Sequence, residues 1–323
     1  DDKYIITPSE GIQAEVSKTT KVNYVKGCAI RDVTMSNIPA AVQAAKESDV
    51  VVLVVGGSSA RDFKTKYIAT GAATVSNDKD EILLDMDCGE GYDRSTLDLL
   101  GDQEKLMQAL IETGKPLVVI YIQGRTLKMN LAAEKANALL TAWYPGGEGG
   151  HGIADVLFGD YNPAGRLPVS IARNEGQLPI YYSKGRQRNY MDGEANALYS
   201  FGYGLSYTKF DYSNLEIKPG NGKDVLQTVS CTVTNTGDRD GHEVVQLYIR
   251  DMVASVAQAP ILLKAFERIS LKKGESKKVT FNLGKKELSI YNMNLEEVVE
   301  PGEFKVMVGA ASNDIRLNGK FEL

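Results

Sequence analysis

Cysteine and histidine are scarce in this chain of 323 residues, and each shortage excludes a class of site. The three cysteines, Cys28, Cys88 and Cys231, are odd in number and lack CxxC spacing, so they predict neither a disulfide framework nor a zinc site. The only histidines are His151 and His242, which excludes a multi-histidine metal centre and leaves few bases for a serine or cysteine triad. The sequence therefore implies no metal.

Long apolar runs and an excess of positive charge are also missing. The net charge of −5 gives no basic surface for nucleic acid or anionic lipid. No apolar run approaches the roughly 20 residues that a membrane-spanning helix requires. The first residues, DDKYIITPSEG, lack the basic and apolar regions of a signal peptide. We therefore expect neither a nucleic-acid partner nor a membrane partner.

The first half of the chain alternates helical and strand patterns. Continuous β-branched runs bounded by glycine favour buried parallel strands, and apolar residues at helical spacing favour helices between them. The expected strands lie in 51–57, 115–124 and 138–147, and the expected helices in 38–49, 100–114, 127–137 and 149–160. This order predicts an α/β domain over residues 1–178, with a mostly parallel sheet covered by helices on both faces.

The second half changes character after about Phe210, where helical periodicity ends and alternating strands begin. Turn signals such as TNTGDRDG and EPGE separate the strands. The expected strands lie in 226–237, 242–251, 261–271, 275–284, 302–312 and 314–323. Short strands with regular turns predict an all-β, fibronectin-III-like (immunoglobulin-like) sandwich over residues 210–323. Residues 179–209, rich in tyrosine and glycine, are interpreted as a linker.

A glycine-rich turn, GGEGGHG, matches the GxGxxG pattern at Gly147, Gly149 and Gly152, after a predicted strand and before a predicted helix. A dinucleotide site also needs an acidic residue about 20 positions further on, at the end of the next strand. The corresponding segment here, RLPVSIA, contains no acidic residue, and no GK[ST] follows the glycines. Tight packing at a strand-to-helix turn explains the glycines better, and we expect no organic cofactor.

A carboxylate between two glycines marks a second candidate site. Glu90 lies between Gly89 and Gly91, and Asp93 and Arg94 follow shortly after. A glutamate on such a loop can project into a cleft and donate a proton to a glycosidic oxygen. The alternative is a solvated loop with an Asp93–Arg94 charge pair. The long stretch before the loop has little periodic pattern, and loops of that length are usually functional or mobile.

Several segments, in order, resemble the second and third domains of glycoside hydrolase family 3. They are VVLVVGG with GEGYDRSTLDLLGDQEKLMQAL, KPLVVIYIQGRTLKMN, ALLTAWYPGGEGGHGIADVLFGDYNPAGRLPVSI, LYSFGYGLSYTKFDYSNL and LLKAFERISLKKGESKKVTFNL. The resemblance covers essentially the whole chain. It implies the same architecture, an α/β sandwich domain followed by a fibronectin-III-like domain.

The resemblance also implies a retaining, two-carboxylate mechanism. The family's acid/base is commonly a glutamate in a GEGY-type loop, which maps onto Gly89, Glu90, Gly91 and Tyr92. Glu90 is therefore the expected general acid/base. The family's nucleophile is an aspartate in an SDW-type motif of an N-terminal barrel, and no SDW occurs in this chain. The missing barrel is thus an expected partner, and the isolated chain is expected to be inactive.

Further expectations concern the substrate and the start of the chain. Arg61, Asp62 and Tyr92 are candidate substrate-binding residues. The chain begins near TPSEGI, so the first strand of the α/β domain is expected to be missing. The predicted activity is that of an exo-acting β-glycosidase on oligosaccharides or aryl β-glycosides, with β-glucosidase favoured over β-xylosidase. The resemblance suggests a periplasmic or secreted location. The alternatives are a non-catalytic carbohydrate-binding or interaction module and a nucleotide-dependent α/β enzyme.

Overall fold

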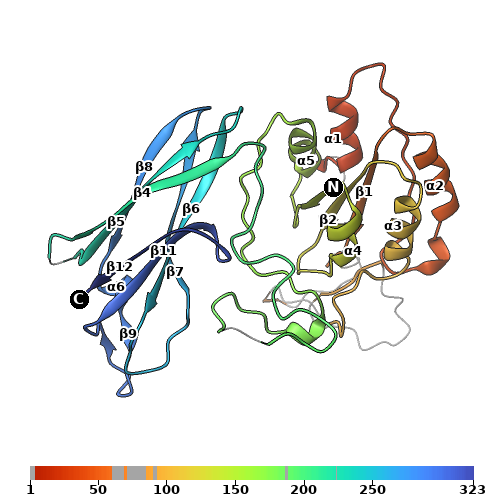
Figure 1. Ribbon diagram of the computed structural model, residues 1–323. Coiled ribbons are helices and arrows are strands. Elements are labelled where there is room, and N and C mark those ends of the chain that lie inside the picture. The colour runs from red at the N-terminus through yellow and green to blue at the C-terminus, as the bar shows by residue number, and fades with distance from the viewer. Residues whose placement is uncertain (1–3, 60–68, 71–84, 90–92, 186–187, 223) are drawn as a thin grey trace. The chain divides into compact units, whose positions relative to one another are not determined.

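The computed structural model describes residues 4–59, 69–70, 85–89, 93–185, 188–222 and 224–323 (Figure 1). The chain divides into two compact units. The α/β unit consists of residues 1–159 and 173–176, and the sandwich unit consists of residues 160–172 and 177–323. Residues 160–172, and the segment that leads into the first strand of the sandwich, therefore belong to the sandwich unit.

The centre of the α/β unit is a parallel sheet with strand order β1-β2-β3. The strands are β1 (Val51–Gly56), β2 (Leu117–Ile122) and β3 (Ala138–Thr141). Val119 and Ile120 are neighbours in β2 and point to opposite faces of the sheet, yet both are fully buried at 0% exposure. Both faces are therefore covered, as the unbroken β-branched runs predict. The predicted parallel sheet is confirmed.

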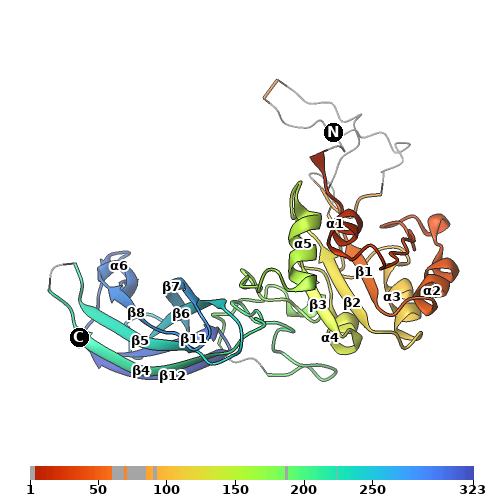
Figure 2. The same ribbon diagram turned by 90° about the horizontal axis from the view of Figure 1, so that it is seen from above.

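Helices lie on both sides of this sheet. They are α1 (Pro8–Glu15), α2 (Ile38–Lys46), α3 (Gln103–Ile111), α4 (Asn130–Lys135) and α5 (Gly149–Phe158), with short 3-10 turns η2 (Val33–Met35) and η3 (Glu175–Gln177). Figure 2 shows α1 and α5 next to each other, with the strands between them and the pair α2 and α3. Among the described helices, none has the length and apolar character needed to cross a bilayer.

Helix α1 was not predicted, although its start carries a capping signal. Thr7 is the N-cap: its Oγ1 accepts a hydrogen bond from the Glu10 amide at 3.3 Å, and the Glu10 carboxylate accepts one from the Thr7 amide at 2.8 Å. This reciprocal pair is a capping box. Only Gly11 of α1 is buried, and a Cβ there would lie 2.1 Å from the Gly150 carbonyl oxygen. The helix is too short and too polar for periodicity to reveal it.

The two layers of the sandwich unit are antiparallel sheets with strand orders β4-β5-β8 and β12-β11-β6-β7 (Figure 1). The strands are β4 (Phe210–Pro219), β5 (Gln227–Asn235), β6 (Gly241–Asp251), β7 (Leu262–Leu271), β8 (Ser276–Leu283), β11 (Glu303–Ala311) and β12 (Asp314–Glu322). The predicted antiparallel sandwich is confirmed.

Four elements of this unit escaped prediction: β4, the helical turn α6 (Lys285–Leu288), and the pair β9 (Ile290–Tyr291) and β10 (Glu297–Val298). The expectation that no helix follows Phe210 is therefore wrong by one turn. A four-residue helix is too short to show a period. In β4 the pairing with β5 shifts between Ser213 and Glu216, and Asn214 has a φ of +52°. Such a bulge interrupts the alternation by which strands are recognised.

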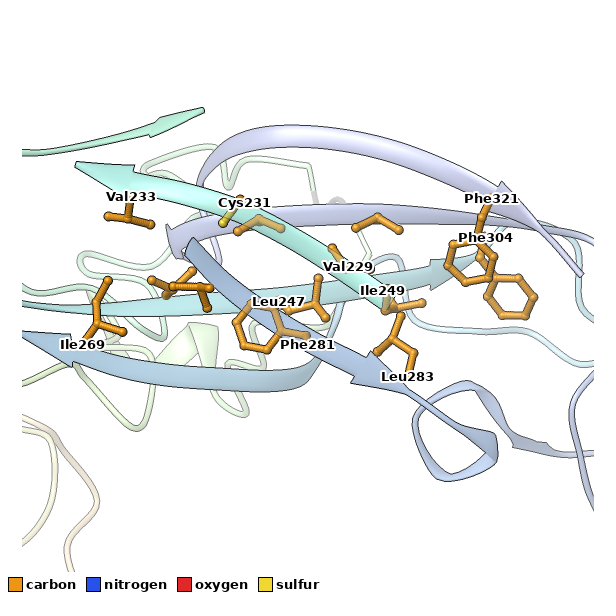
Figure 3. Close-up of a cluster of buried hydrophobic side chains, with 14 of the residues drawn as sticks. Val229, Cys231, Val233, Leu247, Ile249, Ile269, Phe281, Leu283, Phe304 and Phe321 are labelled. Atoms are coloured by element: carbon orange, nitrogen blue, oxygen red, sulfur yellow. The ribbon is translucent and has the colours of Figure 1, made fainter. Parts of the chain in front are cut away.

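The core of the sandwich is made by alternate residues of facing strands (Figure 3). Val229 and Val233 of β5, with Leu247 of β6, have 0% exposure, and Cys231 has 1%. Burial raises the pKa of Cys231 to about 11, so its thiol stays protonated at neutral pH and behaves as an apolar side chain. Each large aliphatic side chain in this layer contributes about 1.5–3 kcal/mol through burial.

The tyrosine-rich segment predicted as a linker makes hydrogen bonds to the sandwich strands. The Tyr182 ring stacks on Phe201 with ring centres 4.4 Å apart. The amide of Gln246 in β6 donates to the Gly202 carbonyl oxygen at 3.2 Å. Gly202 has a φ of +84°, and a Cβ there would lie 2.2 Å from Gln246 Oε1. Glycine is therefore required where this segment approaches β6.

Leu247→Ala should lower the free energy of unfolding of the sandwich by about 2–5 kcal/mol, because it leaves a cavity in a fully buried layer. Leu295→Ala is the matched control: Leu295 is 83% exposed, so its truncation should change stability by less than about 0.5 kcal/mol. Urea unfolding followed by far-UV circular dichroism measures both values. Equal effects of the two substitutions would contradict this packing.

Candidate active-site loop

The four residues proposed from sequence for catalysis and substrate binding are Glu90, Arg61, Asp62 and Tyr92, and all lie outside the described residues. The segments on either side of residues 90–92 are described: 85–89 before them and the chain from Asp93 onward. The site is therefore built from the groups that hold residues 85–89 and the chain from Asp93 onward. We call residues 85–89 and 93–98 together the carboxylate loop.

The carboxylate loop begins next to the carboxyl end of β1, where the side chain of Gln103 meets the backbone. Gln103 Oε1 accepts a hydrogen bond from the Gly56 amide at 2.8 Å, and Gln103 Nε2 donates one to the Gly56 carbonyl oxygen at 3.0 Å. Gln103 is 4% exposed, so these bonds satisfy a buried amide. A Cβ on Gly56, whose φ is +144°, would lie 1.8 Å from the Ile122 carbonyl oxygen. The ends of β1 and β2 can approach this closely only with glycine at that position.

Asp85 and Asp87 fix the entry of the carboxylate loop. The Asp85 carboxylate accepts hydrogen bonds from the Ile30 and Arg31 amides, both at 2.8 Å. The Asp87 amide donates to the Ser58 carbonyl oxygen at 2.9 Å. A side chain on Gly57 would collide with the Asp87 carboxylate, because its Cβ would lie 2.3 Å away. The loop entry is thus held against the residues that directly follow β1.

Arg94 ties the exit of the loop to its entry. Its Nη1 lies 3.2 Å from Asp87 Oδ2, and the two side chains are 6% and 3% exposed. Its Nη2 also donates to the Asp98 carbonyl oxygen. A buried ion pair depends on good geometry and further hydrogen bonds, and removing one partner is costly. The Asp87–Arg94 ion pair therefore joins residues 85–89 to the chain from Asp93 onward.

The charge pair expected between Asp93 and Arg94 is not formed, which corrects the alternative interpretation of this loop. Asp93 Oδ1 accepts from the Arg94 amide at 2.8 Å and pairs with Arg125 Nη1 at 2.9 Å. The Arg94 guanidinium turns instead to Asp87. Neighbouring side chains in an extended segment point in opposite directions, so adjacent opposite charges need not meet. Adjacency in the sequence therefore did not predict which carboxylate pairs with Arg94.

The carboxylate loop carries an exposed carboxylate, Asp93, and a buried thiol, Cys88, and their pKa values shift in opposite directions. The amide of Arg94, and then the guanidinium of Arg125, lower the pKa of Asp93, which is ionised at neutral pH. Burial, and then the charge of Asp87, raise the pKa of Cys88. Cys88 Sγ lies 3.4 Å from Asp87 Oδ1 and donates to it. Cys88 is therefore a neutral thiol at neutral pH and no nucleophile.

The end of β2 forms the other side of the loop. The Gln123 side chain is 0% exposed, accepts from the Leu127 amide at 3.0 Å and donates to Thr141 Oγ1 at 3.0 Å. The backbone amide of Gln123 donates a hydrogen bond to the Trp143 carbonyl oxygen at 3.1 Å. Two residues later, Arg125 pairs with Asp93. The carboxylate loop is thus fixed at the carboxyl ends of β1 and β2, the edge of a parallel sheet where ligands commonly bind.

The glycine-rich turn before α5 is filled by polypeptide. The Gly150 amide donates to the Ile6 carbonyl oxygen at 2.9 Å, and a Cβ on Gly150 would lie 2.1 Å from the Thr7 carbonyl oxygen. The glycines therefore permit close packing against the segment before α1, where a pyrophosphate would sit in a dinucleotide site. Within the described part of the chain, no three histidine, cysteine, aspartate or glutamate side chains form a metal-binding group.

Comparison with known proteins identifies the family. The Glycosyl hydrolase family 3 C-terminal domain matches residues 1–207, and the Fibronectin type III-like domain matches residues 243–312. The first match covers more than half of the chain, which therefore belongs to glycosyl hydrolase family 3. The resemblance found in the motifs is confirmed.

Curated relatives and solved structures agree with this family. The chain is 41% identical to a β-xylosidase of Formosa agariphila, covering 96% of this chain and 40% of the relative. It is 38% identical to a periplasmic β-glucosidase of Salmonella typhimurium, covering 98% and 42%. The structure of a β-glucosidase from Erythrobacter marinus superposes with a TM-score of 0.85 at 35% identity, covering 99% and 43%. The chain thus spans about two fifths of the length of the relatives it matches.

Asp87→Asn should lower the free energy of unfolding of the α/β unit by about 3–5 kcal/mol, because it leaves the buried Arg94 guanidinium without its counter-ion. Asp93→Asn is the matched control on the same loop. Its exposed pair with Arg125 contributes little, so stability should stay almost unchanged. Urea unfolding measures both, and hydrogen exchange of peptides covering residues 93–100 provides a local readout. If Asp87→Asn is as mild as Asp93→Asn, the ion pair does not hold the loop.

Proposed function

We propose that this chain supplies the acid/base loop of a retaining, exo-acting β-glycosidase. Glu90 is the general acid/base, and the nucleophile is an aspartate of a barrel domain outside this sequence. The observation that carries the proposal is the Asp87–Arg94 ion pair, which joins the chain before the GEGY segment to the chain after it, next to the carboxyl edge of the sheet. Membership of glycosyl hydrolase family 3 supports it independently.

In this mechanism Glu90 acts twice. As an acid it protonates the glycosidic oxygen while the barrel carboxylate attacks the anomeric carbon, so the aglycone leaves and a glycosyl-enzyme forms. As a base it then takes a proton from water, which attacks the anomeric carbon and releases the sugar. The two carboxylates must stand about 5–5.5 Å apart. A loop with fixed ends restricts the positions open to Glu90, which lowers the entropy cost of reaching that separation.

The substrate proposal rests on the relatives, which include a β-xylosidase and a β-glucosidase. We assign terminal, non-reducing β-glucosides as the first substrate class and β-xylosides as the second. Arg61, Asp62 and Tyr92 remain the candidate contacts to the sugar, and the barrel is the partner that completes the site. A periplasmic or secreted location is proposed, since one relative is a periplasmic β-glucosidase.

The chain alone should hydrolyse 4-nitrophenyl β-glucoside and β-xyloside no faster than background, because it carries one of the two required carboxylates. The same chain joined to its barrel should turn over both substrates. Release of nitrophenolate is the measurement, with the barrel alone as control. Robust turnover by the chain alone would place the nucleophile within this sequence and overturn the assignment.

Glu90→Ala in the barrel-containing enzyme should slow cleavage of a disaccharide about 10²–10⁴-fold, the usual contribution of a general acid. Glycosylation by a dinitrophenyl glycoside should suffer far less, because dinitrophenolate departs without a proton. Added azide should restore turnover and give a β-glycosyl azide, since azide needs no base. Steady-state kinetics and identification of the azide product test these expectations.

Asp93→Ala is the matched control, because it removes an exposed carboxylate of the same loop and leaves Glu90 in place. It should show neither the leaving-group dependence nor the azide product. If Glu90→Ala behaves like this control, Glu90 is not the acid/base. Azide rescue of Asp93→Ala would transfer the role to Asp93.

A further inference from the structure

The exit of the carboxylate loop is held by a carboxylate from a distant part of the chain. Leu97 belongs to no helix or strand, so no strand pairing or helical turn supplies an acceptor for its amide. This amide donates instead to Glu175 Oε1 at 2.6 Å. A hydrogen bond from a backbone amide to a carboxylate is charge-assisted and is roughly twice as strong as one between neutral groups. Glu175 therefore provides a strong anchor 78 residues further along the chain.

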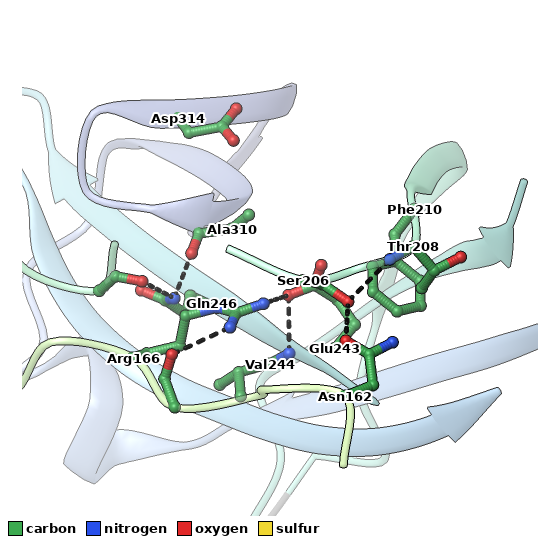
Figure 4. A network of polar contacts seen from close by, with 12 residues as sticks. Asn162, Arg166, Ser206, Thr208, Phe210, Glu243, Val244, Gln246, Ala310 and Asp314 are labelled. Atoms are coloured by element: carbon green, nitrogen blue, oxygen red, sulfur yellow. Dashed lines mark hydrogen bonds and ion pairs between the residues drawn. The ribbon is translucent and has the colours of Figure 1, made fainter. Parts of the chain in front are cut away.

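The segment that carries Glu175 changes from one unit to the other along its length. Residues 160–172 belong to the sandwich unit, where Arg166 Nη2 lies 3.0 Å from Glu243 Oε1 (Figure 4). Residues 173–176 belong to the α/β unit, and the chain from Gln177 onward belongs to the sandwich unit again. These four residues include Glu175, whose carboxylate binds the Leu97 amide within the α/β unit.

Lys128 holds the same point of the loop from the side of β2. The Lys128 amide donates to the Leu97 carbonyl oxygen at 2.7 Å, and Lys128 Nζ lies 3.0 Å from Asp98 Oδ1. The hydrogen bond to Asp98 raises the pKa of Lys128, and the charges of Glu104 and Glu175 act in the same direction. Both backbone groups of Leu97 thus have partners outside the loop, namely Glu175 for the amide and Lys128 for the carbonyl oxygen.

The position of Leu97 affects the buried ion pair, because the next residue supplies an acceptor to Arg94. The Asp98 carbonyl oxygen accepts from Arg94 Nη2, and Arg94 Nη1 lies 3.2 Å from Asp87 Oδ2. A guanidinium donates along fixed directions, so its two acceptors together set its orientation. A shift of residues 97 and 98 would therefore turn the Arg94 guanidinium relative to Asp87.

We propose that Glu175 is a positioning residue of the carboxylate loop. Its carboxylate fixes Leu97, and through Asp98 it fixes the orientation of Arg94 toward Asp87. The proposal rests on the proposed function, since positioning affects catalysis only if this loop carries the acid/base. The Leu97 amide needs an acceptor and not a charge. A neutral side-chain oxygen of the same reach can therefore replace the carboxylate, and a side chain without oxygen cannot.

Hydrogen exchange of the Leu97 amide, followed by NMR on the full chain, is the first measurement. In the unaltered chain this amide should exchange slowly, although it lies outside helices and strands. Glu175→Met keeps the length of the side chain but removes its oxygen atoms, and it should speed the exchange at least about tenfold. Glu175→Gln keeps one acceptor oxygen and should exchange almost as slowly as the unaltered chain. Fast exchange in the unaltered chain would overturn the proposal without any variant.

Glu104→Met is the matched control. Glu104 is exposed on α3 and acts on Lys128 through its charge, as Glu175 does, but the Leu97 amide donates to Glu175. The control should therefore leave both the exchange of Leu97 and the activity unchanged. If the two methionine variants speed the exchange equally, the lost negative charge near Lys128 is the cause, and the proposed role of Glu175 is wrong.

Kinetics of the barrel-containing enzyme provide the second measurement. Glu175→Met should lower kcat for a disaccharide about 10- to 100-fold, because a misplacement of 1 Å can cost about 10²-fold. Glycosylation by a dinitrophenyl glycoside should slow far less, since that leaving group departs without a proton. Glu175→Gln should recover most of the kcat for the disaccharide. An equal loss on both substrates would mean that less enzyme is folded, and it would overturn the positioning role, as would a Glu175→Gln variant as slow as Glu175→Met.

Glu90→Ala, measured alongside, separates this proposal from the proposed function. If Glu90→Ala shows the leaving-group dependence and Glu175→Met does not, the proposed function stands and the role of Glu175 is refuted. If Glu90→Ala shows none, the loop carries no acid/base at Glu90, and both proposals fail. Dependence in both variants, with rescue by Glu175→Gln, is the expected result.

Discussion

The ion pair between Asp87 and Arg94 is the interaction on which the arrangement of the candidate site depends. Two opposite charges removed from water are stable only when they meet, so the entry and the exit of the carboxylate loop are held together. The hydrogen bond from the Asp87 amide to the Ser58 carbonyl oxygen then holds these joined ends beside the residues that follow β1, and Asp85 bonds the Ile30 and Arg31 amides. The position of a catalytic carboxylate on such a loop is set by groups that do not themselves touch the substrate.

The strands of both units could be predicted because their patterns reflect burial directly. The run Leu117–Ile122 is apolar without interruption because both faces of β2 are covered, and β5 alternates because only one face is. The elements that were not predicted lack such a pattern. Helix α1 buries a single glycine, and β4 carries a bulge. Family resemblance supplied what periodicity could not, namely the proposed role of the GEGY segment.

The partners of polar side chains were the least predictable part of the site. Nothing in the sequence near Gln103 indicates that its amide bonds both backbone groups of a glycine 47 residues earlier. Arg94 follows Asp93 directly, yet it pairs with a residue seven positions before it. Such pairings depend on tertiary geometry, because many acceptors compete for each donor and the fold decides which of them is near. A single sequence carries composition and spacing but not that choice.

Trp143 gives the molecule a property that follows from its position. It is the only tryptophan of the chain, and it lies just beyond β3, where its carbonyl oxygen accepts the amide of Gln123. The sandwich unit holds tyrosine and phenylalanine but no tryptophan. Excitation at the red edge of the absorption band therefore yields emission from the α/β unit alone, while circular dichroism reports on both units. Without any label, the two optical signals can resolve whether the units melt together or in sequence.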